Sequence, residues 1–446
     1  MNFESYIADI GTIIGGWPLI SAFVGVGLFA TFMLNFVQFR YLLTSFKLVL
    51  FPDKDETAKK SSATMTPFQA FLNALGTSTG NGSIAGMSAA VYAGGPGAAF
   101  WVLVSGVFAL ALRFAEVYLG TFLIGKKTFR GANGGPMVYL SLVPGGSFLP
   151  FVFMGFMLLY GLSSGNAMQT NSIGLGIQST WGVSPWITAF CLILFLAYVI
   201  FGGAERVLKI SDKLVPFKVG VFFVASFIVL AYHYAALIPA LKLIFESAFS
   251  LKSLGGAAAG ITVQAAIRNG FARSLNAHEG GLGVAPVFFG ESGTREPIKT
   301  SILSMVSAFI STYLVCFVVA LSVIASGVWN SGLSSTALTV SAFNTVFGNY
   351  GGWVVTFCSA SFGLGVLVAF SLVAKESWSF LTGGRWLGLF NIIYCLIAFG
   401  GTLAKVDLIW SVNDIINGLM LLINLYAITW MMPTIRKAVL EYNKKH

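Results

Sequence analysis

The chain has 446 residues, of which 56% are hydrophobic and only 9% are charged, and its mean hydropathy is +0.83. Soluble domains carry about 25% charged residues, so this composition excludes an ordinary soluble protein and indicates a membrane protein. The formal net charge of +10 is compatible with nucleic-acid binding, but most basic residues lie in short loops between apolar runs, so we predict no nucleic-acid partner. The four cysteines lie inside apolar runs without metal-ligand spacing, and we predict no cofactor.

Apolar runs that are long enough to cross a bilayer recur along the whole chain. They predict eleven transmembrane helices, near residues 14–38, 66–93, 96–124, 148–180, 185–201, 212–235, 256–289, 298–327, 350–381, 385–403 and 407–433. We therefore expect an all-α, multi-pass protein of the plasma (inner) membrane. Its partners would be membrane lipid and a small molecule, with no obligate protein partner.

The basic residues fall mostly on one side of these helices, in loops such as 52–64 and 205–213. By the positive-inside rule, the N-terminus is outside and the C-terminus is cytoplasmic. An odd number of spans also requires termini on opposite sides. The expected parts are an N-terminal helix with a cytoplasmic loop, two five-helix repeats and a cytoplasmic tail. Their boundaries are 1–64, 65–250, 251–433 and 434–446.

Two predicted helices are interrupted by glycines and polar residues. Residues 76–86 read GTSTGNGSIAG, and residues 276–283 read NAHEGGLG. When the first helix is left aside, each interruption lies in the first span of a set of five. Because five is odd, the second set enters the membrane from the opposite side. This pattern predicts an inverted-topology repeat with one broken helix in each half.

A broken helix in a membrane frees backbone groups that need partners. The C-terminus of the first half-helix offers carbonyls to a cation, and the N-terminus of the second offers N–H groups to a carboxylate. The two interruptions therefore predict a site for a zwitterion and a cation near the middle of the membrane. The alternative is close helix packing through small residues.

Six motifs in order resemble the alanine or glycine:cation symporters, a family of amino-acid transporters with the LeuT-type fold. They are GNGSIAG with GGPG at 80–97, GGPM at 134–137, GNAMQTNSI at 165–173, FGG with KLVPF at 201–217, AHEGGLGVAP at 277–286 and DIINGLMLLINL at 414–425. The resemblance covers nearly the whole chain. It implies alternating-access symport of a small neutral amino acid, similar to alanine or glycine, with a cation, most readily Na⁺.

The resemblance also implies a set of site residues. The substrate would contact Ser78, Thr79, Asn81, Gly82, Ser83, Gln169, Phe271, Asn276, Ala277 and His278. The carboxylate would meet the amides of Asn81 and Gly82. Na⁺ would be held by Gly76, Thr79, Val368 and Ser371. For Gln169 the alternative is a helix–helix hydrogen bond, and for His278 it is a structural imidazole.

The sequence departs from the family around the ion site. Leu372 stands where the family has a second hydroxyl, and Lys218 stands where it has methionine. An ammonium at Lys218 would stand in for the metal, with H⁺-coupled or uncoupled transport as the result. The alternative is that Lys218 snorkels to the membrane surface while Na⁺ binds the remaining oxygens. Arg113 and Glu116, also inside a span, are either functional groups or snorkelling side chains.

Two other classes of function fit the sequence less well. A membrane enzyme would have to use His278 and Glu279, but neighbouring helical residues do not face each other and no other group completes a catalytic set. A channel needs a continuous polar pore, whereas two inverted broken helices suit a carrier. The identity of the amino acid stays open.

Overall fold

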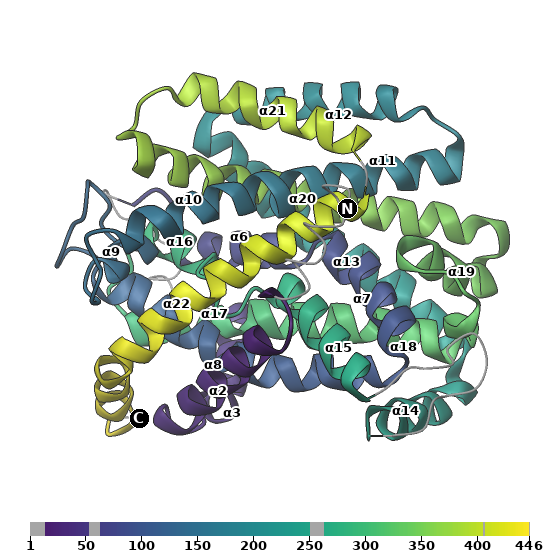
Figure 1. The fold of residues 1–446 in the computed structure, drawn as a ribbon, viewed down its shortest axis with the longest axis horizontal. Coiled ribbons are helices and arrows are strands. Elements are labelled where there is room, and N and C mark those ends of the chain that lie inside the picture. Colours follow the sequence, from purple (N-terminus) through teal and green to yellow (C-terminus); the bar gives the residue numbers. More distant parts are fainter. Residues whose placement is uncertain (1–13, 53–62, 250–262, 405, 446) are drawn as a thin grey trace.

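The computed structural model describes residues 14–52, 63–249, 263–404 and 406–445. Within these ranges the chain is helical, with one isolated β-bridge between Phe129 and Ala132 and no named strand. The N-terminal residues 1–13 and most of the predicted basic loop 52–64 lie outside the described residues. Figure 1 shows the helices as a closely packed bundle, with α22 crossing it diagonally.

The α-helices are α2 (Trp17–Met33), α3 (Val37–Arg40), α4 (Leu42–Leu50), α6 (Pro67–Ser78), α7 (Asn81–Gly94), α8 (Gly97–Phe122), α9 (Pro136–Leu140), α10 (Leu149–Leu162), α11 (Met168–Trp181), α12 (Pro185–Ile200), α13 (Gly203–Tyr232), α14 (Tyr234–Phe249), α15 (Val263–His278), α16 (Ala285–Gly290), α17 (Pro297–Phe309), α18 (Phe317–Ala325), α19 (Ser335–Phe347), α20 (Gly351–Thr382), α21 (Leu387–Leu403) and α22 (Val406–Asn443). Two π-helical segments, η1 (Ser163–Ala167) and η2 (Ile310–Cys316), join α10 to α11 and α17 to α18. Short 3₁₀ turns, η3 (Val328–Asn330) and η4 (Gly348–Tyr350), flank α19.

Long apolar helices account for most of the predicted spans. Six helical segments in the described residues are long and apolar enough to cross a membrane by themselves, and three shorter ones are also apolar. The all-helical membrane class is therefore confirmed. The number of eleven spans and the division into two repeats stay predictions, because the broken helices consist of short pieces that length alone does not identify as spans.

Both predicted interruptions are present. The first separates α6 from α7 at Thr79 and Gly80, where Gly80 is extended with φ −119° and ψ −169°. The second separates α15 from α16 between Glu279 and Val284. In this second break, Gly281 has φ +83° and Gly283 has φ +78°, a region that glycine enters with little strain.

The helix α8 packs against α15 and α17, while α12 and α21 pack together at one edge (Figure 1). Glycine permits the close approach of α15 and its break to α8. A Cβ atom at Gly270 would lie 2.8 Å from the carbonyl oxygen of Ala98, and one at Gly280 would lie 2.8 Å from that of Ala109. The second broken helix is therefore held tightly against α8.

Candidate functional site between the two broken helices

The carbonyl groups at the C-terminal end of α6 are bound by Lys218. This residue of α13 is fully buried, and its Nζ donates hydrogen bonds to the carbonyl oxygens of Gly76 at 2.9 Å and Thr79 at 2.7 Å. The ammonium also lies 5.3 Å from the centre of the Phe362 ring, a favourable cation–π arrangement. Lys218 therefore does not snorkel to the surface, and its Nζ occupies the position expected for a cation.

The remaining oxygens expected for Na⁺ are also engaged. Ser371 Oγ donates to the carbonyl oxygen of Val368 at 2.7 Å, and the next residue, Leu372, has no oxygen in its side chain. Since the carbonyls of Gly76 and Thr79 already accept hydrogen bonds from Lys218 Nζ, the residues as arranged do not fit a sodium ion at this position.

The first turn of α7 faces Gln169 of α11. The N–H group of Asn81 donates to Gln169 Oε1 at 3.1 Å, and Gln169 Nε2 donates to the carbonyl oxygen of Ser164 at 3.0 Å. The first N–H groups of a helix have no partner within the helix. The amide oxygen of Gln169 thus holds the acceptor position that we expected for a substrate carboxylate.

Asn276 lies across from the start of α7. A Cβ atom at Gly82 would be 3.5 Å from Met168 Cε and 3.8 Å from the carbonyl oxygen of Asn276. The side chain of Asn276 turns towards α22, where its Oδ1 accepts hydrogen bonds from Asn413 at 2.9 Å and from Asn417. The main chain of Asn276, rather than its amide, is therefore closest to Gly82.

Ser311 in η2 joins the two breaks, and the sequence patterns did not indicate it. Its Oγ lies 2.7 Å from the carbonyl oxygen of Ser78 and 2.8 Å from that of Ala277, so its single hydrogen can be donated to the end of α6 or to the end of α15. π-Helical segments are frequent at functional sites. The hydroxyls of Thr79 and Ser83 are used close by, because Thr79 donates to Leu75 and Ser83 to Ser78.

Two other expected substrate contacts pack between helices. The ring of His278 stacks on Phe23 of α2 at 5.7 Å, and its Nδ1 accepts a hydrogen bond from the N–H group of Gly280 at 3.1 Å. The ring of Phe271 packs against the rings of Phe23 and Trp101, and the distance between ring centres is 6.2 Å in each pair. These contacts support the structural role for the imidazole of His278.

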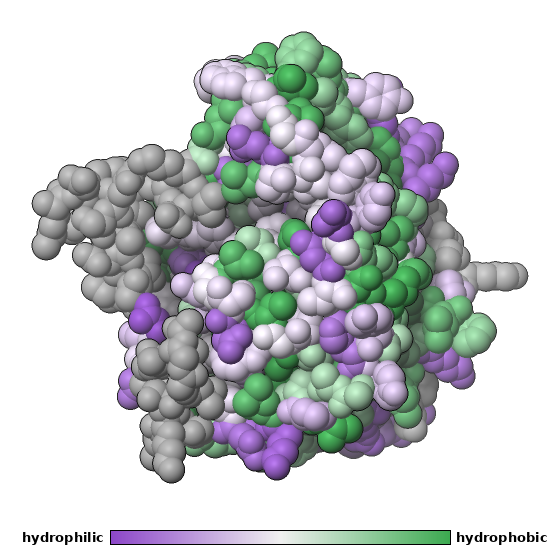
Figure 2. All heavy atoms as spheres, turned by 90° about the vertical axis from the view of Figure 1, so that its right-hand side faces the viewer, coloured by the Kyte–Doolittle hydropathy of each residue, from purple (hydrophilic) through white to green (hydrophobic). Residues whose placement is uncertain are grey.

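A cavity of about 570 Å³ lies beside α15 and α22, and its lining includes Arg268, Arg273, Asn276, Asp414 and Asn417. Arg273 forms an ion pair with Asp414 at 3.9 Å. The cavity also reaches Ser334 and Ser335, where α19 begins. Figure 2, which shows the side of the molecule where α19 lies, has hydrophilic patches spread among apolar residues. Asn276 therefore lines this cavity and also lies opposite Gly82.

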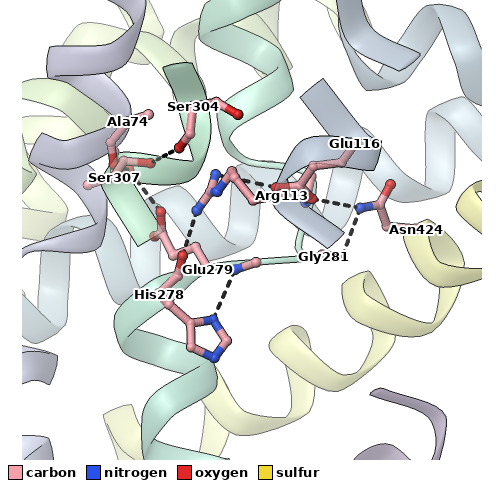
Figure 3. A network of polar contacts seen from close by, with 12 residues as sticks. Ala74, Arg113, Glu116, His278, Glu279, Gly281, Ser304, Ser307 and Asn424 are labelled. Atoms are coloured by element: carbon pink, nitrogen blue, oxygen red, sulfur yellow. Dashed lines mark hydrogen bonds and ion pairs between the residues drawn. The ribbon is translucent and has the colours of Figure 1, made fainter. Parts of the chain in front are cut away.

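A buried ionic network holds the second break in place (Figure 3). Arg113 forms an ion pair with Glu116 at 3.3 Å and donates to the carbonyl oxygen of His278 at 2.5 Å. Glu116 Oε2 accepts hydrogen bonds from the N–H group of Gly283 at 2.9 Å and from Asn424 at 3.1 Å. Both ionic side chains are fully buried, so neither snorkels to the membrane surface.

The sequence of this chain is similar to those of known transporters along nearly its whole length. A model of the sodium:alanine symporter family matches residues 1–446. The chain is 31% identical to the sodium/alanine symporter AgcS of Methanococcus maripaludis, over 100% of this chain and 98% of that protein. It is 28% identical to the probable sodium/glutamine symporter GlnT of Bacillus subtilis, over 96% and 88% of the two chains. The manganese transporter of Eremococcus coleocola superposes with a TM-score of 0.53 at 12% identity, over 83% and 80% of the two chains, which shows a shared LeuT-like fold.

Proposed function

Because this chain belongs to the sodium:alanine symporter family, we propose that it carries a small neutral amino acid together with a cation by alternating access. The observation that carries this proposal is the meeting of two broken helices, with carbonyls at the end of α6, N–H groups at the start of α7 and Asn276 opposite. Such a site offers partners to both charged ends of a zwitterion.

In this proposal the substrate carboxylate binds the N–H groups of Asn81 and Gly82. Gln169 now accepts the hydrogen bond from Asn81, so its amide must rotate when the substrate enters. After rotation, Nε2 of Gln169 can donate to the carboxylate. The substrate ammonium would lie near the carbonyl oxygens of Ser78 and Ala277, which Ser311 brings to the same point.

Sodium is the cation favoured by the family and by the names of its relatives. One observation favours a second version, in which the ammonium of Lys218 is a permanent resident of the predicted sodium position. Its two hydrogen bonds to Gly76 and Thr79 and its complete burial support this version. In it, the covalent cation stabilises the end of α6, and transport needs no sodium at that position.

Exchange of labelled amino acids in proteoliposomes tests both the proposed amino-acid transport and the proposed role of Lys218. We expect saturable counterflow of small neutral amino acids. In the version with Lys218 as the resident cation, its rate should be the same with sodium and with a large organic cation in its place. Lys218→Met should reduce this exchange strongly, because it leaves two buried carbonyls without their donor. Lys209→Met changes an exposed lysine of the same helix and should behave as the native protein. Strict sodium dependence of the native protein would exclude the role proposed for Lys218, and absence of counterflow for every amino acid would exclude the transport function.

A further inference from the structure

Glu279 connects the two broken helices to α10. The candidate site described above does not include this residue. It is the first residue after α15, with φ +53°, and its side chain is buried. Its Oε2 lies 2.8 Å from Thr77 Oγ1 of α6, and its Oε1 lies 3.3 Å from the hydroxyl of Tyr160. Figure 3 shows its side chain directed towards the part of α6 that contains Ala74.

The hydroxyl of Thr77 has two possible acceptors and one hydrogen. Besides Glu279, Thr77 Oγ1 lies 3.0 Å from the carbonyl oxygen of Ala74. If the hydroxyl donates to an ionised Glu279, the contact with the carboxylate is satisfied. If it donates to Ala74, the 2.8 Å contact requires a hydrogen on the carboxyl group of Glu279. The same heavy-atom positions therefore accommodate the carboxyl group with or without a proton.

The charged groups around Glu279 are engaged elsewhere. Arg113 pairs with Glu116 and the carbonyl of His278, and Lys218 binds the carbonyls of Gly76 and Thr79. The imidazole of His278 is neutral, because its Nδ1 accepts a hydrogen bond from Gly280. Among the described residues, no basic side chain forms an ion pair with Glu279.

Glu116 and Glu279 thus differ in a way that bears on proton binding. Glu116 has a cation in contact and two N–H donors, whereas Glu279 has only two hydroxyls. An ionised carboxyl group in a dry interior is costly unless it is paired. Uptake of a proton removes that cost for Glu279, whereas the contacts of Glu116 with Arg113, Gly283 and Asn424 offset part of it.

We propose that Glu279 is a proton-binding site that couples proton movement to transport, and this rests on the amino-acid transport proposed above. The carboxylate takes up one proton from one side of the membrane and releases it to the other. Its partner Thr77 lies on the same turn of α6 as the carbonyls that Lys218 binds. The protonation state therefore acts on the end of the helix that forms the substrate site.

The test uses the full-length protein in sodium-free proteoliposomes with a pH-sensitive dye inside. Addition of a transported amino acid to the native protein should acidify the lumen, and an inward pH gradient should drive accumulation. Glu279→Gln resembles the protonated side chain in shape and charge. It should keep counterflow but lose both acidification and pH-driven accumulation. Glu205→Gln removes an exposed carboxyl group at the start of α13 and should keep all three activities.

A second pair of variants keeps the proposal testable if Glu279→Gln fails to fold. Thr77→Val removes the hydroxyl at nearly constant volume and should lose acidification while counterflow persists, whereas Thr77→Ser should behave as the native protein. Acidification by Glu279→Gln or by Thr77→Val equal to that of the native protein would overturn the proposal. Counterflow by the native protein without acidification would also overturn the proposal, but it would still be consistent with amino-acid transport. Absence of counterflow in the native protein would instead refute the transport function.

Discussion

Gln169 and Asn81 hold each other by a single hydrogen bond at the place where a carboxylate would bind. If Gln169 then donates to the bound carboxylate, Gln169→Ala should raise the apparent substrate constant by about 10- to 100-fold, because a hydrogen bond to a charged group contributes about 1.5–3 kcal/mol. The thermal stability of Gln169→Ala should remain close to that of the native protein. Gln178→Ala changes an exposed glutamine of the same helix and serves as the control. An unchanged substrate constant together with a poorly folded protein would favour the packing role for Gln169.

Gly82 provides a second test at the scale of one residue. The first carbon of a side chain would make ordinary contacts, at 3.5 Å from Met168 Cε and 3.8 Å from the Asn276 carbonyl oxygen, so the fold should tolerate a substitution. The longer side chain of Gly82→Leu would fill the space between α7 and Asn276 and should abolish uptake at normal expression. Gly25→Leu, at an open position of α2, is the matched control. Normal uptake by a well-expressed Gly82→Leu protein would refute this placement of the carboxylate.

At the scale of elements, the approach of α20 to α13 controls the position of Lys218. A Cβ atom at Gly365 would lie 2.7 Å from Lys218 Nζ and 3.0 Å from its Cδ and Cε. Gly365→Ala should therefore push the flexible lysine away from the carbonyls of Gly76 and Thr79. We expect slower counterflow and a loss of about 1–3 kcal/mol in the free energy of unfolding, as for other overpacked sites.

Gly220→Ala is the control for this substitution, because it lies on the same helix as Lys218 and its added Cβ would meet nothing within 4 Å. It should leave both measurements unchanged. Native counterflow in Gly365→Ala, with the thermal stability clearly lowered, would indicate that the contact of Lys218 with α6 serves stability and not transport.

At the scale of the whole molecule, the orientation in the membrane follows from the distribution of basic residues. We expect the start of α13 to be cytoplasmic and the start of α19 to be external. Single cysteines at Lys209 and Ser335 test this in a protein without its own Cys191, Cys316, Cys358 and Cys395. An impermeant thiol reagent added outside intact cells should label Ser335→Cys and spare Lys209→Cys. The reverse pattern would show that the predicted orientation is wrong.

Local sequence was sufficient to predict most of the long helices and the two interruptions, but not α14 and α19, which lie largely between the predicted spans. Apolar runs specify membrane helices wherever they occur, because each run must satisfy its backbone within itself. The glycines at the breaks indicate where regular helix ends, and the structure confirms both breaks, with α6 ending at Ser78 and α15 at His278. Lys218 also lies close to α6, as the resemblance to the symporter family implied.

Only the tertiary structure decided what each polar group does. The sequence left open whether Arg113 and Glu116 reach the membrane surface, and they are buried together. Ser311 and Tyr160 gave no local signal, because their roles depend on residues of other helices, more than thirty positions away along the chain. His278 stood in the expected motif, yet its ring packs against Phe23 of α2. A helix and its ends are determined by neighbours along the chain, whereas the partner of a buried polar side chain is determined by whichever helix packs against it.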